Sequence, residues 1–309
     1  MNMKIKNIKP QKLKGYVFSK LSVIWRSLSK IIPFDVVYLH GYYFLLMEKK
    51  LNLKNPRTFQ EKLQWLKLND RNPKYISLVD KYEVRTIISK KIGEKYLIPF
   101  YGVWDSFDDI DFNILPDQFV LKATHDSGSV IIVKNKSEFL NSTDFAKAKK
   151  KITKKLNYNY FYAGREWASK HVKPRIIAEK YLFNKKNNDL SDYKFFCFSG
   201  IPKLLFIASD RFKGGKTKFD FFDLNFTRLP FSAHGHPHND KLGKPKNLDK
   251  MIDIATKLSE GIPHVRIDLY NLNGDIYFGE YTFYHDGGFV PFIPDEWNKT
   301  IGDFIELPK

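Results

Sequence analysis

Residues 263–282 constrain the fold of this chain most strongly, because they predict a β-hairpin that carries charges inside its strands. Apolar and polar residues alternate on both sides of the turn sequence Asn273-Gly274-Asp275, a pattern typical of two antiparallel strands. Arg266, Asp268 and Glu280 lie within these strands rather than at the tip. Charges in such positions require a partner or a function.

The type of turn decides whether these charges share one face of the sheet. A tight two-residue turn at Asn273-Gly274 would direct Asp268 and Glu280 to opposite faces. A type I turn with Gly274 as a left-handed bulge would instead place Glu280 opposite Arg266, on the face that carries Asp268. We predict the bulged turn, since a tight turn without a compensating bulge would separate the two carboxylates.

The shared face has two interpretations. Asp268 and Glu280 beside a cationic Arg266 would suit Mg²⁺ held against phosphate oxygens. For the hairpin alone, a salt bridge across the two strands is the alternative. The rest of the chain has to decide between them.

The composition indicates a folded protein with an anionic partner. A chain of 309 residues with 43% hydrophobic residues can form one large or two modest domains. Its net charge of +18 attracts a nucleotide, a phosphorylated glycan, a nucleic acid or an acidic membrane surface.

The single cysteine, Cys197, excludes an internal disulfide and fits a reducing cytosol, and its strand-like surroundings predict a buried, inert thiol.

The N-terminal residues 1–70 predict a basic helical region. Up to Lys54, eleven basic residues stand against only Asp35 and Glu48. The aromatic and aliphatic residues between them have helical spacing, which fits either an amphipathic helix lying on anionic lipid or a solvated helix packed on the body. No secretory signal is expected, and Pro33, Asp35 and His40 interrupt residues 31–47, so any membrane contact would be peripheral.

The remaining chain predicts an α+β fold with mostly antiparallel strands. Thr58 followed by Glu61 forms a capping box that starts a helix, and a second helix over 77–92 ends at Gly93. The other elements are strands at 98–104, 119–122 and 130–133, a helix at 146–156, and strands at 175–181, 193–198 and 203–208.

Three upstream positions suit a nucleotide. Lys122 ends a strand and precedes a small polar loop, so it could hold phosphate oxygens, although a plain hairpin with an exposed lysine would look the same. Glu179 ends an apolar strand, where a carboxylate could pair with the exocyclic amine of adenine. Asp192 could accept hydrogen bonds from ribose hydroxyls.

The order of these motifs resembles the ATP-grasp superfamily. Lys81, Lys122 with its loop, Glu179 to Leu182, Asp192, and then Arg266-x-Asp268 and Glu280-x-Thr282 follow one another as in that superfamily. Several short motifs resemble its TupA-like branch, which is associated with teichuronopeptide and surface, or capsule, polysaccharide synthesis. These motifs are Asn55 to Lys62, Val79 to Arg85, Tyr193 to Phe198, Val265 to Tyr270 and Phe278 to Glu280.

The resemblance implies an ATP-grasp fold, in which two α+β subdomains hold the nucleotide between antiparallel sheets. A catalytic region at 71–309 would contain a nucleotide-gripping lobe at about 115–190 and a metal and substrate lobe at about 191–309. The residues implied for ATP are Lys81 and Lys122 on the phosphates, the loop with His125, Ser127, Gly128 and Ser129 over them, Glu179, Lys180 and Leu182 at adenine, and Asp192 at ribose. Asp268 and Glu280 would bind Mg²⁺, and Arg266 and Arg211 would stabilise the reacting groups.

The implied reaction is activation of a carboxylate, that of a sugar acid, as an acyl phosphate that an amine or amino acid then attacks. The partners would be an anionic small-molecule or lipid-linked glycan acceptor and, through residues 1–54, an anionic membrane surface; nucleic acid is not expected. The protein would act in the cytoplasm, at the inner face of the membrane if residues 1–54 bind lipid. The alternatives are phosphoryl transfer to a glycan hydroxyl and a non-enzymatic basic module that binds nucleic acid or membrane.

Two features depart from the pattern or lie outside it. Thr282 occupies the place where many ATP-grasp enzymes have an asparagine that binds metal, and the loop has one glycine, Gly128, where the family usually has more. His234, His236 and His238 alternate in an extended segment and could bind Zn²⁺. The neighbouring glycine and proline favour a loop without metal instead.

Overall fold

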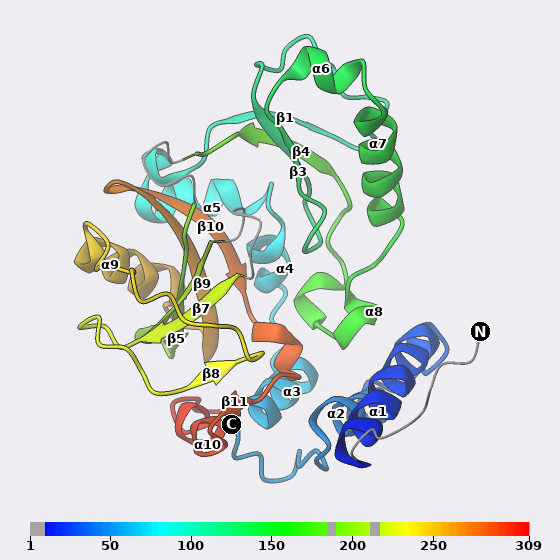
Figure 1. Cartoon of the computed structure of the whole chain (residues 1–309), viewed down its shortest axis with the longest axis vertical. Helices are drawn as coiled ribbons and strands as arrows, with labels where there is room; N and C mark the ends of the chain where they lie inside the picture. Colours follow the sequence, from blue (N-terminus) through cyan, green and yellow to red (C-terminus); the bar gives the residue numbers. More distant parts are fainter. Residues whose placement is uncertain (1–9, 184–189, 211–216, 309) are drawn as a thin grey trace.

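The computed structural model describes residues 10–183, 190–210 and 217–308, and it confirms the α+β prediction (Figure 1). The α-helices are α1 (Pro10–Ser27), α2 (Asp35–Met47), α3 (Phe59–Asn69), α4 (Lys74–Val79), α5 (Val84–Ile92), α6 (Lys136–Leu140), α7 (Thr143–Leu156), α8 (Phe161–Gly164), α9 (Leu248–Ser259) and α10 (Glu296–Gly302). Four short 3₁₀ helices also occur: η1 (Leu28–Lys30), η2 (Glu94–Tyr96), η3 (Trp167–Ser169) and η4 (His285–Gly288).

The strands form two main antiparallel sheets and one short pair. The four-stranded sheet has the order β1-β4-β2-β3 and consists of β1 (Phe100–Trp104), β2 (Phe119–Ala123), β3 (Ile131–Val133) and β4 (Ile176–Lys180). The five-stranded sheet has the order β10-β9-β5-β6-β7 and consists of β5 (Asp192–Phe198), β6 (Ile201–Ser209), β7 (Lys218–Phe222), β9 (His264–Leu272) and β10 (Asp275–Thr282). β8 (Ser232–Ala233) pairs with β11 (Phe292–Ile293).

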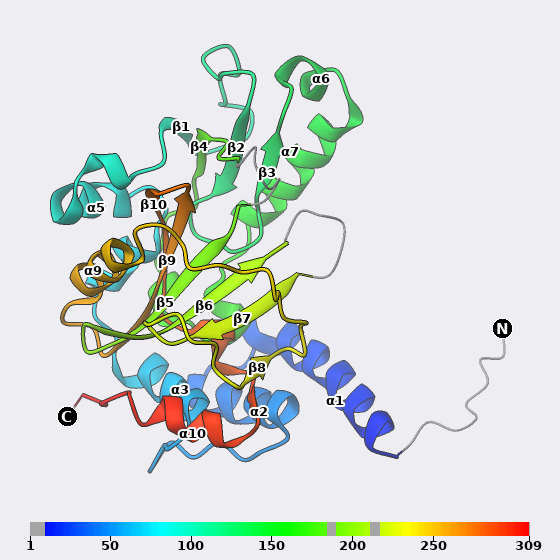
Figure 2. The same cartoon turned by 60° about the vertical axis from the view of Figure 1, so that its left-hand side comes forward.

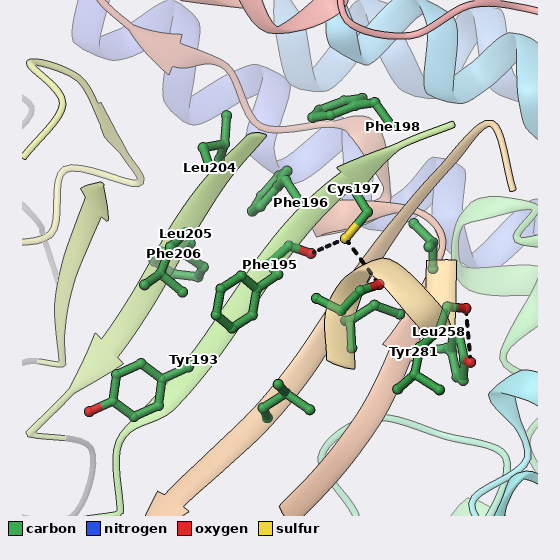
Figure 3. Packing of buried hydrophobic residues seen from close by; sticks show 14 of the residues in the cluster. Tyr193, Phe195, Phe196, Cys197, Phe198, Leu204, Leu205, Phe206, Leu258 and Tyr281 are labelled. Carbon is green, nitrogen blue, oxygen red and sulfur yellow. Dashed lines mark hydrogen bonds between the residues drawn. The ribbon is translucent and has the colours of Figure 1, made fainter. Parts of the chain in front are cut away.

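Each main sheet has its own core, and the two sheets lie in different parts of the molecule (Figure 2). Ala148 and Ile152 of α7 pack on the four-stranded sheet. Met251 and Ala255 of α9 pack on one face of the five-stranded sheet, and Figure 3 shows the side chains of β5 and β6 in this core. The expected lobe boundaries at residues 71, 115 and 191 remain predictions, although β1 belongs to the four-stranded sheet and precedes residue 115.

Cys197 lies in this core, as predicted. It is fully buried, and its Sγ lies 3.9 Å from the carbonyl oxygen of Ala255 in α9. Burial raises the pKa of the thiol to about 12. The thiol is therefore protonated at neutral pH and is not a nucleophile.

The expected single helix over 77–92 is wrong, because the chain breaks into α4 and α5 at Asp80. The Asp80 carboxylate accepts the backbone N–H of Tyr82 at 2.8 Å, and Arg175 donates to it at 2.6 Å. An aspartate that captures nearby backbone N–H groups competes with helical hydrogen bonds. The break allows the Lys81 N–H to bond the carbonyl of Thr124, so Lys81 is fixed beside the loop that follows β2.

The helix signals on either side of this break are confirmed. Thr58 caps α3, and Glu61 reciprocates through its side chain, which gives the expected capping box. The second helical segment ends at Ile92, and Gly93 follows with a positive φ of 106°. The turn between β5 and β6 places both Ser199 and Gly200 in the left-handed region.

The predicted bulged turn in the β9–β10 hairpin is also wrong, but the shared face exists. Leu272 pairs with Asp275, so Asn273 and Gly274 form a tight two-residue turn with φ values of 57° and 114°. The register then shifts between Phe278 and Glu280, which makes Gly279 a β-bulge. This bulge moves Glu280 opposite Asp268 rather than opposite Arg266.

Only a small residue suits the bulge. A Cβ atom at Gly279 would lie 3.0 Å from the carbonyl oxygen of Asp268. The side-chain period is two, so one extra residue returns Glu280 to the face of Asp268. The tight turn alone would place Asp268 and Glu280 on opposite faces, and the bulge that brings them to one face lies in strand β10 instead of in the turn.

Candidate nucleotide and substrate site

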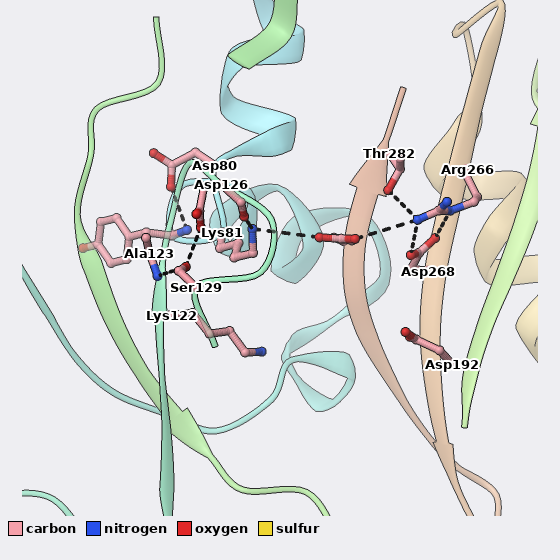
Figure 4. A network of polar contacts seen from close by, with 12 residues as sticks. Asp80, Lys81, Lys122, Ala123, Asp126, Ser129, Asp192, Arg266, Asp268 and Thr282 are labelled. Carbon is pink, nitrogen blue, oxygen red and sulfur yellow. Dashed lines mark hydrogen bonds and ion pairs between the residues drawn. The ribbon is translucent and has the colours of Figure 1, made fainter. Parts of the chain in front are cut away.

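A cavity of about 400 Å³ lies between the loop after β2 and the charged face of the β5–β9–β10 strands. We call it the central cavity. It brings together nine of the predicted residues, which Figure 4 shows in part: Lys81, Lys122, Ser127, Gly128, Ser129, Asp192, Arg266, Asp268 and Glu280. The charged face is opposite α9, because Cys197 and Lys194 point to different sides of β5.

Arg266 is fixed from three sides. Its Nε and Nη2 donate to the two Asp268 oxygens at 2.7 and 2.8 Å, and Nη2 also donates to Thr282 Oγ1 at 3.0 Å. Its Nη1 donates to Nδ1 of His285 at 2.6 Å. Burial lowers the pKa of His285 to about 4, so the ring is neutral and can accept. The guanidinium is therefore preorganised beside the cavity.

Lys194 is a site residue that the sequence prediction missed. Its Nζ forms a buried ion pair with Asp268 and a second one with Asp192 at 3.0 Å. The available signal was a lysine in the strand Tyr193 to Phe198, whose other residues are aromatic apart from Cys197. Lys194 links the predicted ribose position to the predicted metal ligand.

Glu280 is held less tightly than Asp268. Its carboxylate oxygens lie 3.9 Å from Lys81 Nζ and 3.9 Å from Arg266 Nη2, and 38% of its side chain is exposed. Burial favours a raised pKa, but Lys81, Lys194 and Arg266 outweigh it and lower the pKa of Glu280 below its usual value. The carboxylate is therefore charged and open to a further cation.

The loop after β2 is built by its own side chains. Ser129 accepts the backbone N–H of Ala123 at 2.9 Å and donates to Asp126. Lys81 Nζ donates to the Asp126 carbonyl at 2.6 Å. Ser127 and Gly128 at the tip line the central cavity, and Gly128 has a positive φ of 91°. The predicted phosphate-binding site therefore has Lys122 and the loop after β2 in the lining of the same cavity.

A second hollow of about 540 Å³ adjoins the central cavity, and we call it the apolar cavity. Lys122, Gly128, Val130 and Tyr270 line both. Its further lining includes Lys180, Leu182 and the apolar residues Ile98, Val120, Ile132 and Phe183. Apolar walls beside strand backbone suit a flat base such as adenine.

Glu179 takes a different position from the one expected. It does not line any of the cavities described, because Lys122 Nζ lies 2.8 Å and Arg85 Nη1 lies 3.2 Å from its carboxylate. The carboxylate accepts two cationic donors and so orients Lys122. Direct pairing of Glu179 with adenine would require these ion pairs to rearrange.

A third hollow of about 210 Å³ shares lining residues with the central cavity, among them Arg266 and Glu280, and none with the apolar cavity. We call it the acidic cavity, since Glu166, Glu280, Asp126 and Asp286 line it. Tyr160 and Ser169 are among the other lining residues, and Arg266 and Lys81 line both this cavity and the central one. Sequence analysis missed Glu166, which lies in a loop without a local motif.

His125 faces the acidic cavity and not the central one. Its Nε2 lies 3.0 Å from the Lys155 carbonyl and 3.2 Å from the Tyr158 carbonyl, so the ring is anchored to the end of α7 and the segment after it. In this position His125 does not line the central cavity, so the structure gives no support to its predicted contact with the ATP phosphates. Arg211, the other predicted catalytic residue, lies outside the described residues.

The residues at the hairpin fit Mg²⁺ bound together with a nucleotide. Within residues 10–183, 190–210 and 217–308, no three His, Cys, Asp or Glu side chains gather as a metal cage. Mg²⁺ is usually held by one or two carboxylates plus substrate phosphates, so Asp268 and Glu280 on one face are a sufficient protein contribution. Asp268 already accepts Arg266 and Lys194, and Glu280 is the more open ligand.

The three alternating histidines bind separate partners. His234 Nε2 lies 2.8 Å from Asp286, and this hydrogen bond raises the pKa of His234. His236 Nδ1 lies 2.7 Å from the Thr217 carbonyl, and His238 Nδ1 lies 3.2 Å from Asp220. These contacts tie the segment to β7 and to η4.

Comparison with known proteins identifies one family. The model of a family described as TupA-like ATP-grasp matches residues 61–306. No curated protein matches the chain.

Similar solved structures include three ligases or synthetases. D-alanine–D-alanine ligase from Bacillus anthracis complexed with ATP is 15% identical, with 67% of this chain and 55% of that chain covered and a TM-score of 0.38. N5-carboxyaminoimidazole ribonucleotide synthetase from Thermus thermophilus is 12% identical, with 79% and 52% covered and a TM-score of 0.37. The ATP-grasp ligase PsnB complexed with minimal precursor, Mg and ADP is 11% identical, with 72% and 57% covered and a TM-score of 0.36. The chain thus spans little more than half the length of these proteins.

Proposed function

Because the chain belongs to the TupA-like ATP-grasp family, we propose that it is an ATP- and Mg²⁺-dependent ligase that joins a carboxylate to an amine. The family match covers residues 61–306, and it agrees with the resemblance inferred from the motifs. The carboxylate would belong to a sugar acid, and the amine to an amino acid or a similar donor. Surface polysaccharide synthesis in the cytoplasm is the process that we propose for it.

One observation carries this proposal. The central cavity places Lys81 and Lys122 with the Ser127-Gly128 loop on one side, and Arg266, Asp268 and Glu280 on the other. Cations opposite a metal-binding carboxylate pair suit the polyphosphate of ATP, and the adjoining apolar cavity suits its base. The acidic cavity, which also adjoins the central cavity, leaves room for a second substrate.

The chain's residues would act by positioning and by neutralising charge. The carboxylate of the acid attacks the γ-phosphorus of ATP, ADP leaves, and an acyl phosphate forms. The amine nitrogen then attacks the acyl carbon, and phosphate leaves. Lys81 and Lys122 hold the phosphates, and Arg266 stabilises the charge that develops on the reacting carboxyl group. Mg²⁺ at Asp268 and Glu280 would supply further charge neutralisation on the phosphates.

The expected result is ADP release that requires both an acid and an amine. Purified protein with Mg-ATP and a panel of uronic acids and their nucleotide-linked forms is assayed for ADP with and without amino acids. Hydroxylamine replaces the amine in a parallel series, because it traps an acyl phosphate as a hydroxamate. Protein without acid serves as the blank.

The three candidate functions give different outcomes. ADP release with a glycan hydroxyl and without hydroxamate would replace the ligase with a phosphotransferase. Saturable ATP binding is required by either enzyme. Nucleic-acid binding that weakens steeply with salt, together with no saturable ATP binding, would overturn both in favour of a basic binding module.

A further inference from the structure

The acidic cavity contains a carboxylate that no described residue binds. Glu166 forms no hydrogen bond and no ion pair through its carboxylate within the part of the chain that the structure describes, and this carboxylate faces the cavity beside Tyr160 and Asp286. The four acidic residues share the lining of this cavity with only two basic residues, Lys81 and Arg266, apart from His125. A carboxylate withdrawn from bulk water calls for a cationic partner.

Two cations, Lys67 and Arg266, have the largest electrostatic effect on Glu166, and both already donate hydrogen bonds to other acceptors. Lys67 Nζ donates to Gln64 Oε1 at 2.9 Å, to the Gly164 carbonyl at 2.7 Å and to the Gly287 carbonyl at 2.6 Å. These three acceptors use all three ammonium hydrogens. Arg266 donates to Asp268, Thr282 and His285, as described above. Both cations favour the charged form of Glu166 without binding it directly.

We propose that Glu166 binds the ammonium group of the amine substrate in the acidic cavity, an inference that rests on the proposed ligase function. Arg266 and Glu280 line both this cavity and the central one, so an amine held by Glu166 would lie beside the reacting carboxyl group. Tyr160 offers an aromatic wall, which also suits a cation. The ligand class is therefore a primary amine that is protonated in solution.

The same carboxylate can release the nucleophile. An ammonium nitrogen has no free electron pair, so it must lose one proton before it attacks. Glu166 accepts that proton and becomes a neutral acid, and the freed electron pair forms the bond to the acyl carbon as phosphate leaves with the electrons of its bond. Burial raises the pKa of Glu166 above its usual value, which improves it as a proton acceptor.

The test is the variant Glu166→Gln with saturating acid and Mg-ATP. We expect the KM for the amine to rise about tenfold to 100-fold, because a charge-assisted hydrogen bond is lost, while the KM for ATP changes by less than about twofold. Trapping by hydroxylamine, which is uncharged at pH 7, should keep its rate. Glu260→Gln, an exposed glutamate on the surface after α9, is the matched control and should change neither constant.

The readouts separate this inference from the function on which it rests. If no acid gives hydroxamate in the unchanged protein, the ligase proposal fails. If hydroxamate forms and Glu166→Gln leaves the KM for the amine unchanged, only the ammonium site fails. Glu166→Asp keeps the charge, so it should recover part of the lost affinity; equal losses in both variants would indicate a role in packing and would overturn the proposal.

An independent observation concerns the outer surface of the N-terminal helices. Four apolar side chains recur at helical spacing on one exposed stripe of α1 and η1: Val17, Leu21, Ile24 and Leu28. The adjacent stripe packs on α2 instead. Ser22 and Ser29 are buried there, and Trp25 Nε1 donates to the Tyr38 carbonyl at 3.1 Å. In Figure 2, α1 projects from the body, so its exposed stripe is accessible.

The apolar surface continues around the connection to α2. Ile31 and Phe34 are 75% and 70% exposed, and Val36, Val37 and Phe44 of α2 are exposed as well. Ten of the large apolar side chains that are exposed in the described chain lie between residues 17 and 44. Such concentration marks an interaction surface. We call it the N-terminal apolar surface.

The charges next to the N-terminal apolar surface indicate which kind of partner it binds. Residues 10–34 contain no acidic residue, and the exposed Lys20 and Lys30 lie among the apolar positions, whereas Arg26 is hydrogen-bonded to Tyr158. Asp35 is bound by Arg71 at 2.7 Å and by Arg165 at 3.3 Å, so its charge is compensated. No described helix combines the length and apolar character needed to cross a membrane. We infer that the N-terminal apolar surface lies on an anionic lipid surface, with its basic residues at the headgroups.

Vesicle sedimentation tests this inference with the full chain. Binding to phosphatidylcholine vesicles that contain phosphatidylglycerol is expected, with much weaker binding to phosphatidylcholine alone. The triple variant Leu21→Ser, Ile24→Ser, Leu28→Ser should bind these vesicles at least about tenfold more weakly than the unchanged chain. The double variant Ile114→Ser, Ile201→Ser removes apolar side chains that are 58% and 54% exposed elsewhere, and it should bind normally.

Two outcomes would overturn the lipid assignment. The first is equal vesicle binding by the unchanged chain and the triple variant. The second is a dimer in lipid-free solution that the triple variant abolishes, since that would make a second copy of the chain the occupant.

Discussion

Glu280→Gln is expected to lower the rate of Mg-ATP turnover by about 10²–10³-fold while the protein keeps its unfolding midpoint. Glutamine retains the size of the side chain but removes the charge that would bind Mg²⁺. The folded state should not suffer, because the Glu280 side chain is 38% exposed and its two cations lie 3.9 Å away. Turnover is measured as ADP release, and stability by denaturant unfolding.

Asp268→Asn provides the matched comparison and should lose both activity and stability. The Asp268 carboxylate is buried and accepts Arg266 and Lys194, which are themselves buried. Its removal leaves the buried Arg266 without its carboxylate partner and takes from Lys194 one of its two, at a cost of about 3–5 kcal/mol. Near-normal turnover in either variant would contradict the metal assignment, and an unchanged unfolding midpoint in Asp268→Asn would contradict the proposed difference between the two carboxylates.

Lys67→Met is expected to lower the free energy of unfolding by about 3–5 kcal/mol. Lys67 is fully buried in α3 and joins it to the carbonyls of Gly164 and Gly287. Methionine fills the volume but donates no hydrogen bond, so the Gly164 carbonyl loses its donor, the Gly287 carbonyl keeps only Gln64, and Glu166 loses a stabilising charge. Urea unfolding followed by circular dichroism measures the change.

Lys62→Met in the same helix is the control. Lys62 Nζ donates to a single acceptor, the Ile305 carbonyl at 2.7 Å, in a partly exposed position, so the expected loss is about 1 kcal/mol. The double variant Lys67→Met, Glu166→Gln should recover part of the loss, because the uncompensated carboxylate is removed as well. Equal losses for Lys62→Met and Lys67→Met would refute the central role of Lys67.

Local signals predicted much of the fold. The capping box at Thr58 and the glycine after Ile92 each depend on residues that are close in sequence, and each is confirmed. The two errors have a common physical origin. Asp80 ends α4 with support from the distant Arg175, and Gly279 forms its bulge against the Asp268 backbone, so neither depends on local sequence alone.

The site was predictable where residues follow a known order of motifs. Lys81, Lys122, Asp192, Arg266 and Glu280 were found in this way, and they line one cavity. Lys67 and Glu166 were not found, since nothing near them in sequence distinguishes a buried charge from a surface one. Their roles depend on contacts between α3, the loop after α8 and η4, which only the folded chain brings together.

The bulge at Gly279 separates two design problems that a regular hairpin would couple. The tight turn sets which residues pair near the tip, whereas the bulge sets the pairing of Glu280 with Asp268 in the central cavity. An engineer could therefore shorten or lengthen the tip by matched pairs of residues without altering the alignment of Glu280 with Asp268. Deleting the single residue Gly279 would do the opposite, since every side chain from Glu280 onward would change faces while the turn stayed the same.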